Sequence, residues 1–254
     1  MQLLFYTFTH INAAPKMKTF KYPKKEDWKV ILSRPAKEKK NLQDLVSDVF
    51  SEVKQRGDKA VNHFTQKFDQ VDISNLRVTS SEIKEAISTV DPKLKAAITI
   101  AIANITKFHA NQQFTEDAVE TTEGVTCWRK STPINKVGLY IPGGTAPLFS
   151  TVLMLAIPAK IAGCQEIVLC TPPNKEGKIH PAILYAADKV GVSCIVKAGG
   201  IQAIAGLTFG TESITQVYKI FGPGNQFVTA AKEMSISEGI AIDMPAGPSE
   251  VLVF

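Results

Sequence analysis

The sequence predicts an α/β protein in which a doubly wound parallel sheet follows a mainly helical first part. Short apolar runs typical of buried strands recur from residue 136 onward, and each interval between them has room for one crossover helix. The starts of the runs are about 23 to 30 residues apart, as repeated strand–helix–strand units require. The runs span residues 137–141, 166–170, 193–196, 216–221 and 240–242.

Units of this kind, joined by right-handed crossovers, build a Rossmann-like sheet with helices on both faces. Ligands bind such sheets in the crevice beyond the carboxyl ends of the strands. We therefore expect the functional residues of this chain in the loops that follow the five predicted strands.

The first part of the chain carries signals for three helices and for little sheet. Apolar residues of segment 41–54 fall at spacings of three and four, which places them on one helical stripe. A Ser-Ser pair before Glu82 predicts the start of a second helix, and the pair Asp91-Pro92 predicts the start of a third. Only a short strand candidate, residues 76–78, interrupts them. The packing partner of these helices is therefore expected elsewhere in the chain.

This pattern divides the chain into four segments. Residues 17–135 are predicted to be the helical portion of an incomplete first domain, and residues 136–246 a Rossmann-like domain. Residues 1–16 lack the features of an export signal, and we expect a leader that is not native. Residues 247–254 begin as a loop and become an apolar run; because a bare hydrophobic strand would form an exposed edge, we expect a strand cut short.

Composition and charge exclude several classes of function. The 254 residues are 44% hydrophobic and 21% charged, which is typical of a globular protein with a sizeable core. The longest apolar run, 152–162, is broken by Pro158 and is too short for a membrane span. The net charge of +5 arises within residues 1–40, which carry +7 and leave −2 for the rest. Without a nucleic-acid-reading motif, this indicates a solvated arm and no nucleic-acid partner.

The cysteines and histidines indicate neither a disulfide framework nor a metal site. The four cysteines include no CxxC pair, which fits a reducing compartment, and we expect a cytoplasmic protein. The four histidines show no metal-ligand spacing. Cys164 and Cys170 remain alternatives as nucleophiles toward an aldehyde, although their apolar surroundings favour buried, inert thiols.

Three predicted strands lead into loops that contain glycine and proline. Gly143 and Gly144 follow the first strand, where they either admit a pyrophosphate to the backbone N–H groups or form a tight turn. Asn225 ends a Gly-Pro-Gly turn, where it is a helix cap, a ligand contact or both. Ser249 and Glu250 follow another rigid turn, and their side chains contact a ligand or the local backbone.

Four long motifs, in order along the chain, carry a family resemblance. They read VGLYIPGGTAPLFSTVLMLAIPAKIAGC, GGIQAIAGLTFGTESI, KIFGPGNQFVTAAK and AIDMPAGPSEVLVF. With these motifs the chain resembles histidinol dehydrogenase, and the similarity covers the sequence from about Met17 to Phe254. Agreement over four such motifs is far more specific than any one glycine loop.

The resemblance implies roles for four residues. Tyr140, Gln202 and Asn225 match positions that contact NAD, and Ser249 matches a position that binds the substrate. It also implies the oxidation of L-histidinol through the aldehyde to L-histidine with two NAD, a bound zinc, a Glu-His acid/base pair and a homodimer. Tyr140 lies near the end of a predicted strand, and the other three residues follow predicted strands. We therefore expect the three NAD contacts close together at the carboxyl edge of the sheet and mostly accessible to solvent.

The chain departs from the family pattern in one respect. In the family, the zinc ligands and the Glu-His pair come after the AGPSEVLV motif, where this chain ends. We therefore expect no catalytic and no metal-binding residue in this chain, no metal site around Ser249, and no useful turnover. Since the family's chain returns to the first domain after this motif, we also expect 251–254 to be poorly packed and the apolar faces of the first helices to be under-covered.

Two other readings remain open at this point. An aldehyde dehydrogenase-like enzyme would need an exposed, activated cysteine near the nicotinamide. A non-catalytic fragment would retain dinucleotide binding or pair with full-length subunits.

Overall fold

The computed structural model describes residues 19–33, 39–113, 117–144 and 146–245, with only the backbone of 39–41. The short helices η1 (Lys25–Asp27) and α1 (Trp28–Ile31) belong to one unit of the chain, and everything described from Lys39 onward belongs to a second, compact unit. None of the helices within the described residues combines the length and apolar character that crossing a bilayer requires. Residues 251–254, expected to be poorly packed, lie outside the described residues.

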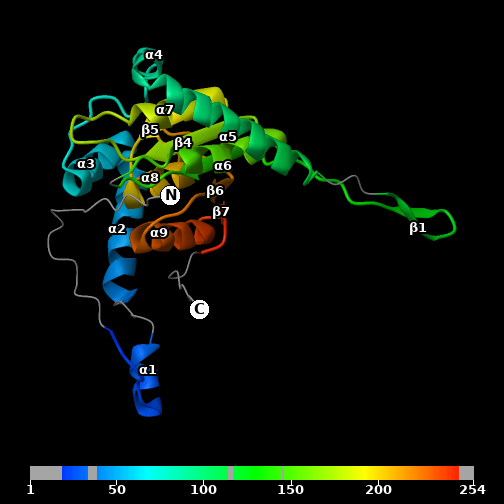
Figure 1. Cartoon of the computed structure of the whole chain (residues 1–254), viewed down its shortest axis with the longest axis horizontal. Helices are drawn as coiled ribbons and strands as arrows, with labels where there is room; N and C mark the ends of the chain where they lie inside the picture. The colour runs from blue at the N-terminus through cyan, green and yellow to red at the C-terminus, as the bar shows by residue number, and fades with distance from the viewer. Residues whose placement is uncertain (1–18, 34–38, 114–116, 145, 246–254) are drawn as a thin grey trace, which may run out of the picture. The chain divides into compact units, whose positions relative to one another are not determined.

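Five parallel strands form the central sheet in the order β5-β4-β3-β6-β7 (Figure 1). The strands are β3 (Lys136–Tyr140), β4 (Glu166–Thr171), β5 (Cys194–Lys197), β6 (Lys219–Phe221) and β7 (Ala241–Ile242). Each predicted strand is present, and the first strand of the sheet lies at its centre. Successive strands add to one side of β3 and then to the other, which confirms the predicted doubly wound, Rossmann-like fold.

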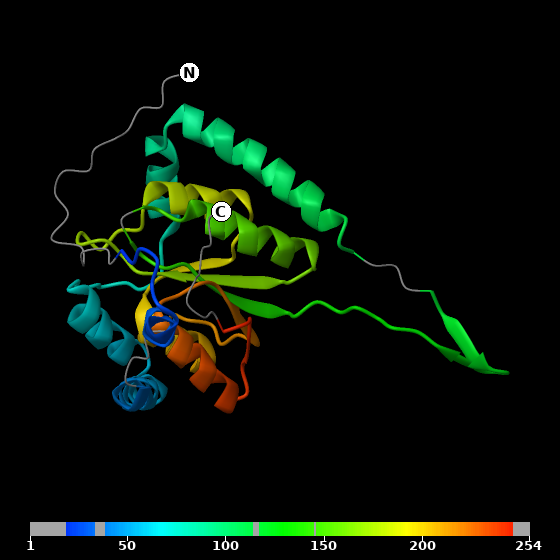
Figure 2. The same cartoon turned by 60° about the horizontal axis from the view of Figure 1, so that its bottom comes forward.

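Strands β3, β4, β5 and β6 alternate their side chains between two apolar clusters. Leu139 and Ile167 belong to the cluster on one face of the sheet, whereas Tyr140 and Val168 belong to the cluster on the other. Strands β3, β4 and β5 are buried on both faces, which is why they read as nearly continuous apolar runs. Helices cover both faces (Figure 2).

The helices lie in two layers on each side of the sheet. The inner helices are α6 (Phe149–Ile161), α7 (Pro181–Lys189), α8 (Gly200–Phe209) and α9 (Gln226–Ser237), and the outer helices are α2 (Lys39–Arg56), α3 (Asp58–Asp69), α4 (Ser80–Thr89) and α5 (Pro92–Ala110). Helices α2 and α3 pack on α8, and α2 also packs on α9. On the opposite side α4 packs on α7 and α5 on α6.

The outer layer explains why the inner helices carry so few polar residues. From Ile201 to Thr208 every residue of α8 is buried, and so are six consecutive residues of α7, from Ala182 to Ala187. A helix that is apolar all round must be covered on all sides. The helices of the first part supply that cover.

Two of the predicted helix starts are confirmed. At α4 the cap is Thr79, one residue before the serine pair, and it forms a capping box with Glu82. At α5 the Asp91 carboxylate accepts hydrogen bonds from the backbone N–H groups of Lys93 and Leu94, and Pro92 is the first helical residue.

The expectation that the first helices are under-covered is wrong for α2 and α3. Val46, Val49 and Val61 are fully buried, because these helices pack on α8 within the compact unit. The outer face of α5 does remain open, with Ile100 and Phe108 largely exposed. The division of the chain into domains at residue 136 stays a prediction.

Some elements differ from the predicted ones. The strand candidate 76–78 is a single antiparallel bridge, in which Arg77 pairs with Val196 at the edge of the sheet. Helix α3 was not predicted, nor was the antiparallel hairpin of β1 (Val119–Thr122) and β2 (Val125–Cys127), whose residues are all exposed.

Helix α3 is fastened at its start by the carboxylate of Asp58. This carboxylate accepts hydrogen bonds from Thr211 Oγ1 at 2.5 Å, from Ser213 Oγ at 2.5 Å and from the backbone N–H of Ser213 at 3.1 Å. The loop after α8 is thereby joined to the first turn of α3. A second residue of the same loop also binds Asp58, since the carboxylate of Glu212 accepts a hydrogen bond from the backbone N–H of Asp58 at 2.8 Å.

We predict that Asp58→Ala lowers the free energy of unfolding by about 1 to 3 kcal/mol, because three donors lose their acceptor. Urea unfolding followed by circular dichroism measures the change. Asp72→Ala removes the same charge at an exposed position and should shift the free energy by less than about 0.5 kcal/mol. Equal effects of the two substitutions would contradict the anchoring role of Asp58.

Candidate functional site

A pocket of about 530 Å³ opens beyond the carboxyl ends of β3, β4, β5 and β6. The loops after these strands contribute Pro142, Gly143, Gly144, Pro172, Pro173, Gly200 and Asn225. The order of the strands reverses between β3 and β6, so the pocket lies at the switch point of the sheet, where open α/β sheets bind ligands. Its volume is within the range of small-molecule sites.

Tyr140 is the last residue of β3 and lines the pocket. Its phenol oxygen accepts a hydrogen bond from the backbone N–H of Gly200 at 3.1 Å. Burial raises the pKa of Tyr140 to about 12, the bond from Gly200 opposes this rise, and the charge of Asp69 adds to it. The phenol is therefore neutral at ordinary pH, and its O–H remains available to donate to a ligand.

Gln202 lies in the first turn of α8, behind the pocket wall. Its Nε2 donates to Oδ2 of Asp69 at 3.3 Å, and Asp69 lines the pocket. Among the described residues the buried Oε1 of Gln202 has no hydrogen-bond partner. Gln202 thus touches the site through Asp69.

The expected solvent accessibility is wrong for two of the three residues. Tyr140 is 3% exposed and Gln202 is 0% exposed, because α2 and α3 cover α8 and this end of the sheet. Asn225 is exposed, as expected. The structure does bring the three residues to the carboxyl edge of the sheet, as their positions relative to the predicted parallel strands led us to expect.

Asn225 caps helix α9. Its Oδ1 accepts hydrogen bonds from the backbone N–H groups of Phe227 at 3.0 Å and Val228 at 3.1 Å. Both of these bonds use the oxygen of the amide, so Nδ2 is the part that can donate to a ligand in the pocket. The cap and a ligand contact are therefore compatible.

The site contains residues that the sequence reasoning missed. Leu45, Phe68 and Asp69 come from the outer helices α2 and α3, and Phe227 comes from α9. The rings of Phe68 and Phe227 are 41% and 37% exposed, which is unusual for large apolar side chains. The apolar spacing of Val61, Phe64 and Phe68 was a signal for α3, but nothing local in it indicates a pocket.

Asp69 is the last residue of α3 and a half-buried acid. Burial raises its pKa, and the hydrogen bond from Gln202 opposes the rise. Within the described part of the chain it is the one charged side chain that lines the pocket.

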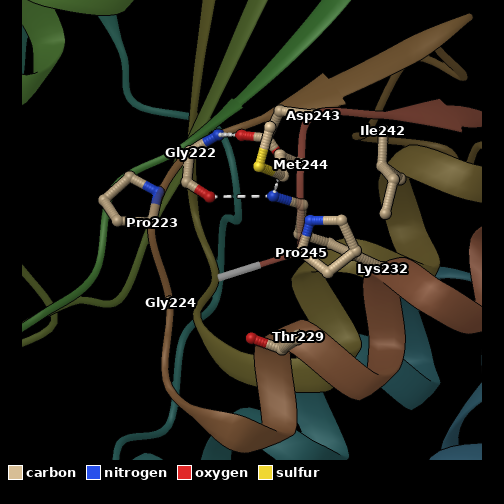
Figure 3. A pocket seen from close by; sticks show the side chains of 9 residues that line it. All are labelled: Gly222, Pro223, Gly224, Thr229, Lys232, Ile242, Asp243, Met244 and Pro245. Carbon is tan, nitrogen blue, oxygen red and sulfur yellow. Dashed lines mark hydrogen bonds and ion pairs between the residues drawn. The ribbon is translucent and has the colours of Figure 1, made fainter. Parts of the chain in front are cut away.

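A network around Gly222 fixes the loop that carries Asn225 (Figure 3). Lys232 Nζ donates to the carbonyl oxygen of Gly222 at 2.9 Å and forms an ion pair with Asp243. Oδ2 of Asp243 accepts from the backbone N–H of Gly222 at 2.8 Å. Lys232 and Asp243 thus satisfy both backbone groups of one residue, beside a second pocket of about 230 Å³.

Position 222 requires glycine, both for its backbone conformation and for lack of space. Its φ is +132°, and a Cβ at this position would lie 2.1 Å from the carbonyl oxygen of Tyr140. The loop after β6 therefore passes directly against the end of β3. This contact sets the positions of Tyr140 and Asn225 relative to each other.

The cysteines weighed as nucleophiles do not line this pocket. Cys170 is fully buried and Cys164 is nearly so, and burial raises the pKa of both thiols. Such thiols stay protonated at ordinary pH, which disfavours the aldehyde dehydrogenase-like reading. Ser249 lies outside the described residues.

The fold and the pocket define the class of this chain: a Rossmann-like α/β protein with a ligand pocket at the switch point of its sheet. The family model of histidinol dehydrogenase matches residues 32–254. The chain belongs to the histidinol dehydrogenase family, as its four motifs indicated.

Curated relatives and a solved structure agree with this assignment. The chain is 61% identical over 237 residues to histidinol dehydrogenase from Bacteroides thetaiotaomicron, covering 93% of this chain and 55% of the relative. It is 52% identical over 231 residues to the enzyme from Salmonella typhimurium, covering 90% and 52%. Histidinol dehydrogenase from Elizabethkingia anophelis superposes with a TM-score of 0.84 at 54% identity, covering 89% and 52%. The chain spans about half the length of these relatives.

We predict that Lys232→Met loosens the loop of Asn225, because the carbonyl of Gly222 and the carboxylate of Asp243 lose their partner. The free energy of unfolding should fall by about 1 to 3 kcal/mol, measured by urea unfolding. Lys178→Met breaks an ion pair with Glu85 whose side chains are both more than half exposed, and it should change stability by less than about 1 kcal/mol. If both variants are equally stable, the network does not hold the loop.

A second prediction concerns Tyr140 and alkaline pH. Its folded-state pKa of about 12 lies above the ordinary 10.0, so the folded state favours the neutral phenol. The resulting stability is fully present below pH 10 and is lost as pH rises through 12. Between pH 9 and pH 12 the wild type should lose about 2 kcal/mol more unfolding free energy than Tyr140→Phe. Parallel pH profiles would show that Tyr140 titrates normally.

Proposed function

We propose that the chain supplies the NAD-binding site of a histidinol dehydrogenase, an NAD-dependent oxidoreductase. The reaction is the oxidation of L-histidinol through the aldehyde to L-histidine with two NAD, the last step of histidine biosynthesis, in a cytoplasmic homodimer. The observation that carries the proposal is the pocket at the switch point, lined by residues of the family's own motifs.

The pocket offers partners to a base and to polar groups of a dinucleotide. The half-exposed rings of Phe68 and Phe227 suit a base, and the phenol O–H of Tyr140 and the Nδ2 of Asn225 suit polar groups of the ligand. NAD would be the hydride acceptor in the reaction. The residues of this chain bind and orient it.

Gly144 supports this reading more specifically than its neighbour does. A Cβ on Gly143 would lie 2.6 Å from Pro172, so packing alone requires a glycine there. A Cβ on Gly144 would meet no atom of the described residues within 4 Å, and the φ of Gly144 is outside the left-handed region. Neither packing against the described residues nor backbone geometry requires glycine at 144, and the close approach of a pyrophosphate to the backbone would account for it.

The described residues do not fit the zinc of the proposed reaction. They contain no group of three or more His, Cys, Asp or Glu side chains placed to hold a metal ion. The role proposed for this chain therefore includes no step at zinc. We propose that Ser249 contacts the substrate. We also propose that the 254 residues alone do not oxidise histidinol. A turnover assay with histidinol and NAD, together with zinc analysis of the purified chain, tests this: stoichiometric zinc with NADH formation would refute it.

The binding site is tested by titrating NAD into the 254-residue chain by calorimetry. Asn225→Ala should weaken NAD binding by about 1 to 3 kcal/mol, because the amide contact is lost. Asn225→Ser keeps an oxygen that caps α9 and should retain stability while losing the same affinity.

Gly144→Ala serves as a matched variant in the same titration. Its stability should stay within about 0.5 kcal/mol of the wild type, because the added methyl group meets open space. Its NAD affinity should fall, since that space is proposed to hold the ligand. Unchanged affinity in all three variants, or no binding to the wild type, would place the dinucleotide elsewhere.

A further inference from the structure

The charge of the pocket is unusual for a site proposed to bind a dinucleotide. Asp69 is the one charged side chain among its described lining residues, and neither lysine nor arginine accompanies it. Its carboxylate is half-buried, so water screens it less than a surface acid. A negatively charged ligand group near Asp69 would be repelled.

Two acceptor atoms, Oδ1 of Asp69 and Oε1 of Gln202, have no donor among the described residues. Oδ2 of Asp69 accepts from Gln202 Nε2, which leaves Oδ1 for a ligand. Oε1 of Gln202 is buried without a partner among the described residues. It also lies 3.1 Å from the place that a Cβ on Gly200 would take, and Gly200 lines the pocket. The carboxylate of Asp69, which lines the pocket, is an acceptor that matches hydroxyl groups, because these donate hydrogen bonds.

The position that usually supplies an acidic residue for ribose binding holds proline in this chain. In Rossmann-like sheets an acidic residue that follows the second strand binds the ribose hydroxyls of NAD. In this chain the second strand is β4, and Pro172 and Pro173 follow it directly in the pocket. Neither proline has a side chain that could bind a diol. Asp69, from the outer helix α3, brings a carboxylate to the same pocket.

We propose that Asp69 selects NAD over NADP by binding the hydroxyls of the adenosine ribose. The inference rests on the proposed function, since it requires NAD in this pocket. A vicinal diol supplies O–H donors to the carboxylate of Asp69, whose Oδ2 is already held by Gln202. In NADP the 2′-hydroxyl is replaced by a phosphate monoester, which removes a donor and brings about −1.5 to −2 charges toward the carboxylate. Asp69 thus acts as a specificity-determining residue.

The experiment measures binding of NADH and NADPH by fluorescence titration to the 254-residue chain. Wild type should bind NADH at least about tenfold more tightly than NADPH. Asp69→Asn and Asp69→Ser should reduce this preference by about tenfold or more, with weaker NADH binding and tighter NADPH binding. Asp72→Asn, an exposed acid three residues away, makes the same change in net charge and should keep the wild-type preference.

The outcomes separate the inference from the proposed function. If the wild type binds neither nucleotide, the proposed function fails. If it binds NADH and both Asp69 variants keep the wild-type ratio, the selection role is overturned while the NAD site stands. If the Asp69 variants bind NADH and NADPH more weakly by the same factor, Asp69 only supports the pocket, and the inference is also overturned. Circular dichroism identifies any variant that fails to fold, and the second substitution at Asp69 then decides.

Discussion

The close approach of Gly222 to the end of β3 is the constraint on which the pocket depends. Any side chain at 222 would collide with the carbonyl oxygen of Tyr140, so only glycine allows the loop after β6 to pass here. Lys232 and Asp243 then hold both backbone groups of Gly222. With the loop fixed in this way, Asn225 caps α9 at the mouth of the pocket that Tyr140 lines.

The sheet and the location of the site were predictable because they depend on local signals. Parallel strands buried on both faces read as apolar runs, and their spacing required crossover helices. A doubly wound parallel sheet was then expected from right-handed connections, and its carboxyl edge was expected as the place for ligands. The cap at Asn225 was equally visible, since asparagine after a Gly-Pro-Gly turn is a familiar helix start.

The chemical character of the site was less predictable, because it arises from packing between distant segments. Asp69 and Phe68 reach the pocket only because α3 packs on α8. The spacing of apolar residues within α3 does not reveal that contact. The same packing buries Tyr140 and Gln202, which a reading of strand ends alone places in solvent. Only the tertiary arrangement shows that Gln202 acts on the pocket through another side chain.

The two-layered helical cover has a consequence for how this architecture can be inherited. Helices α7 and α8 bury residues on all their faces, with the sheet on one side and an outer helix on the other. The sheet and its inner helices therefore cannot be passed to another protein as a self-contained module, because without the segment that precedes them two apolar surfaces would be exposed on opposite sides of the sheet. Gene fusion or domain shuffling would have to carry α2–α5 and the sheet together. The outer helices and the pocket are therefore expected to be inherited together.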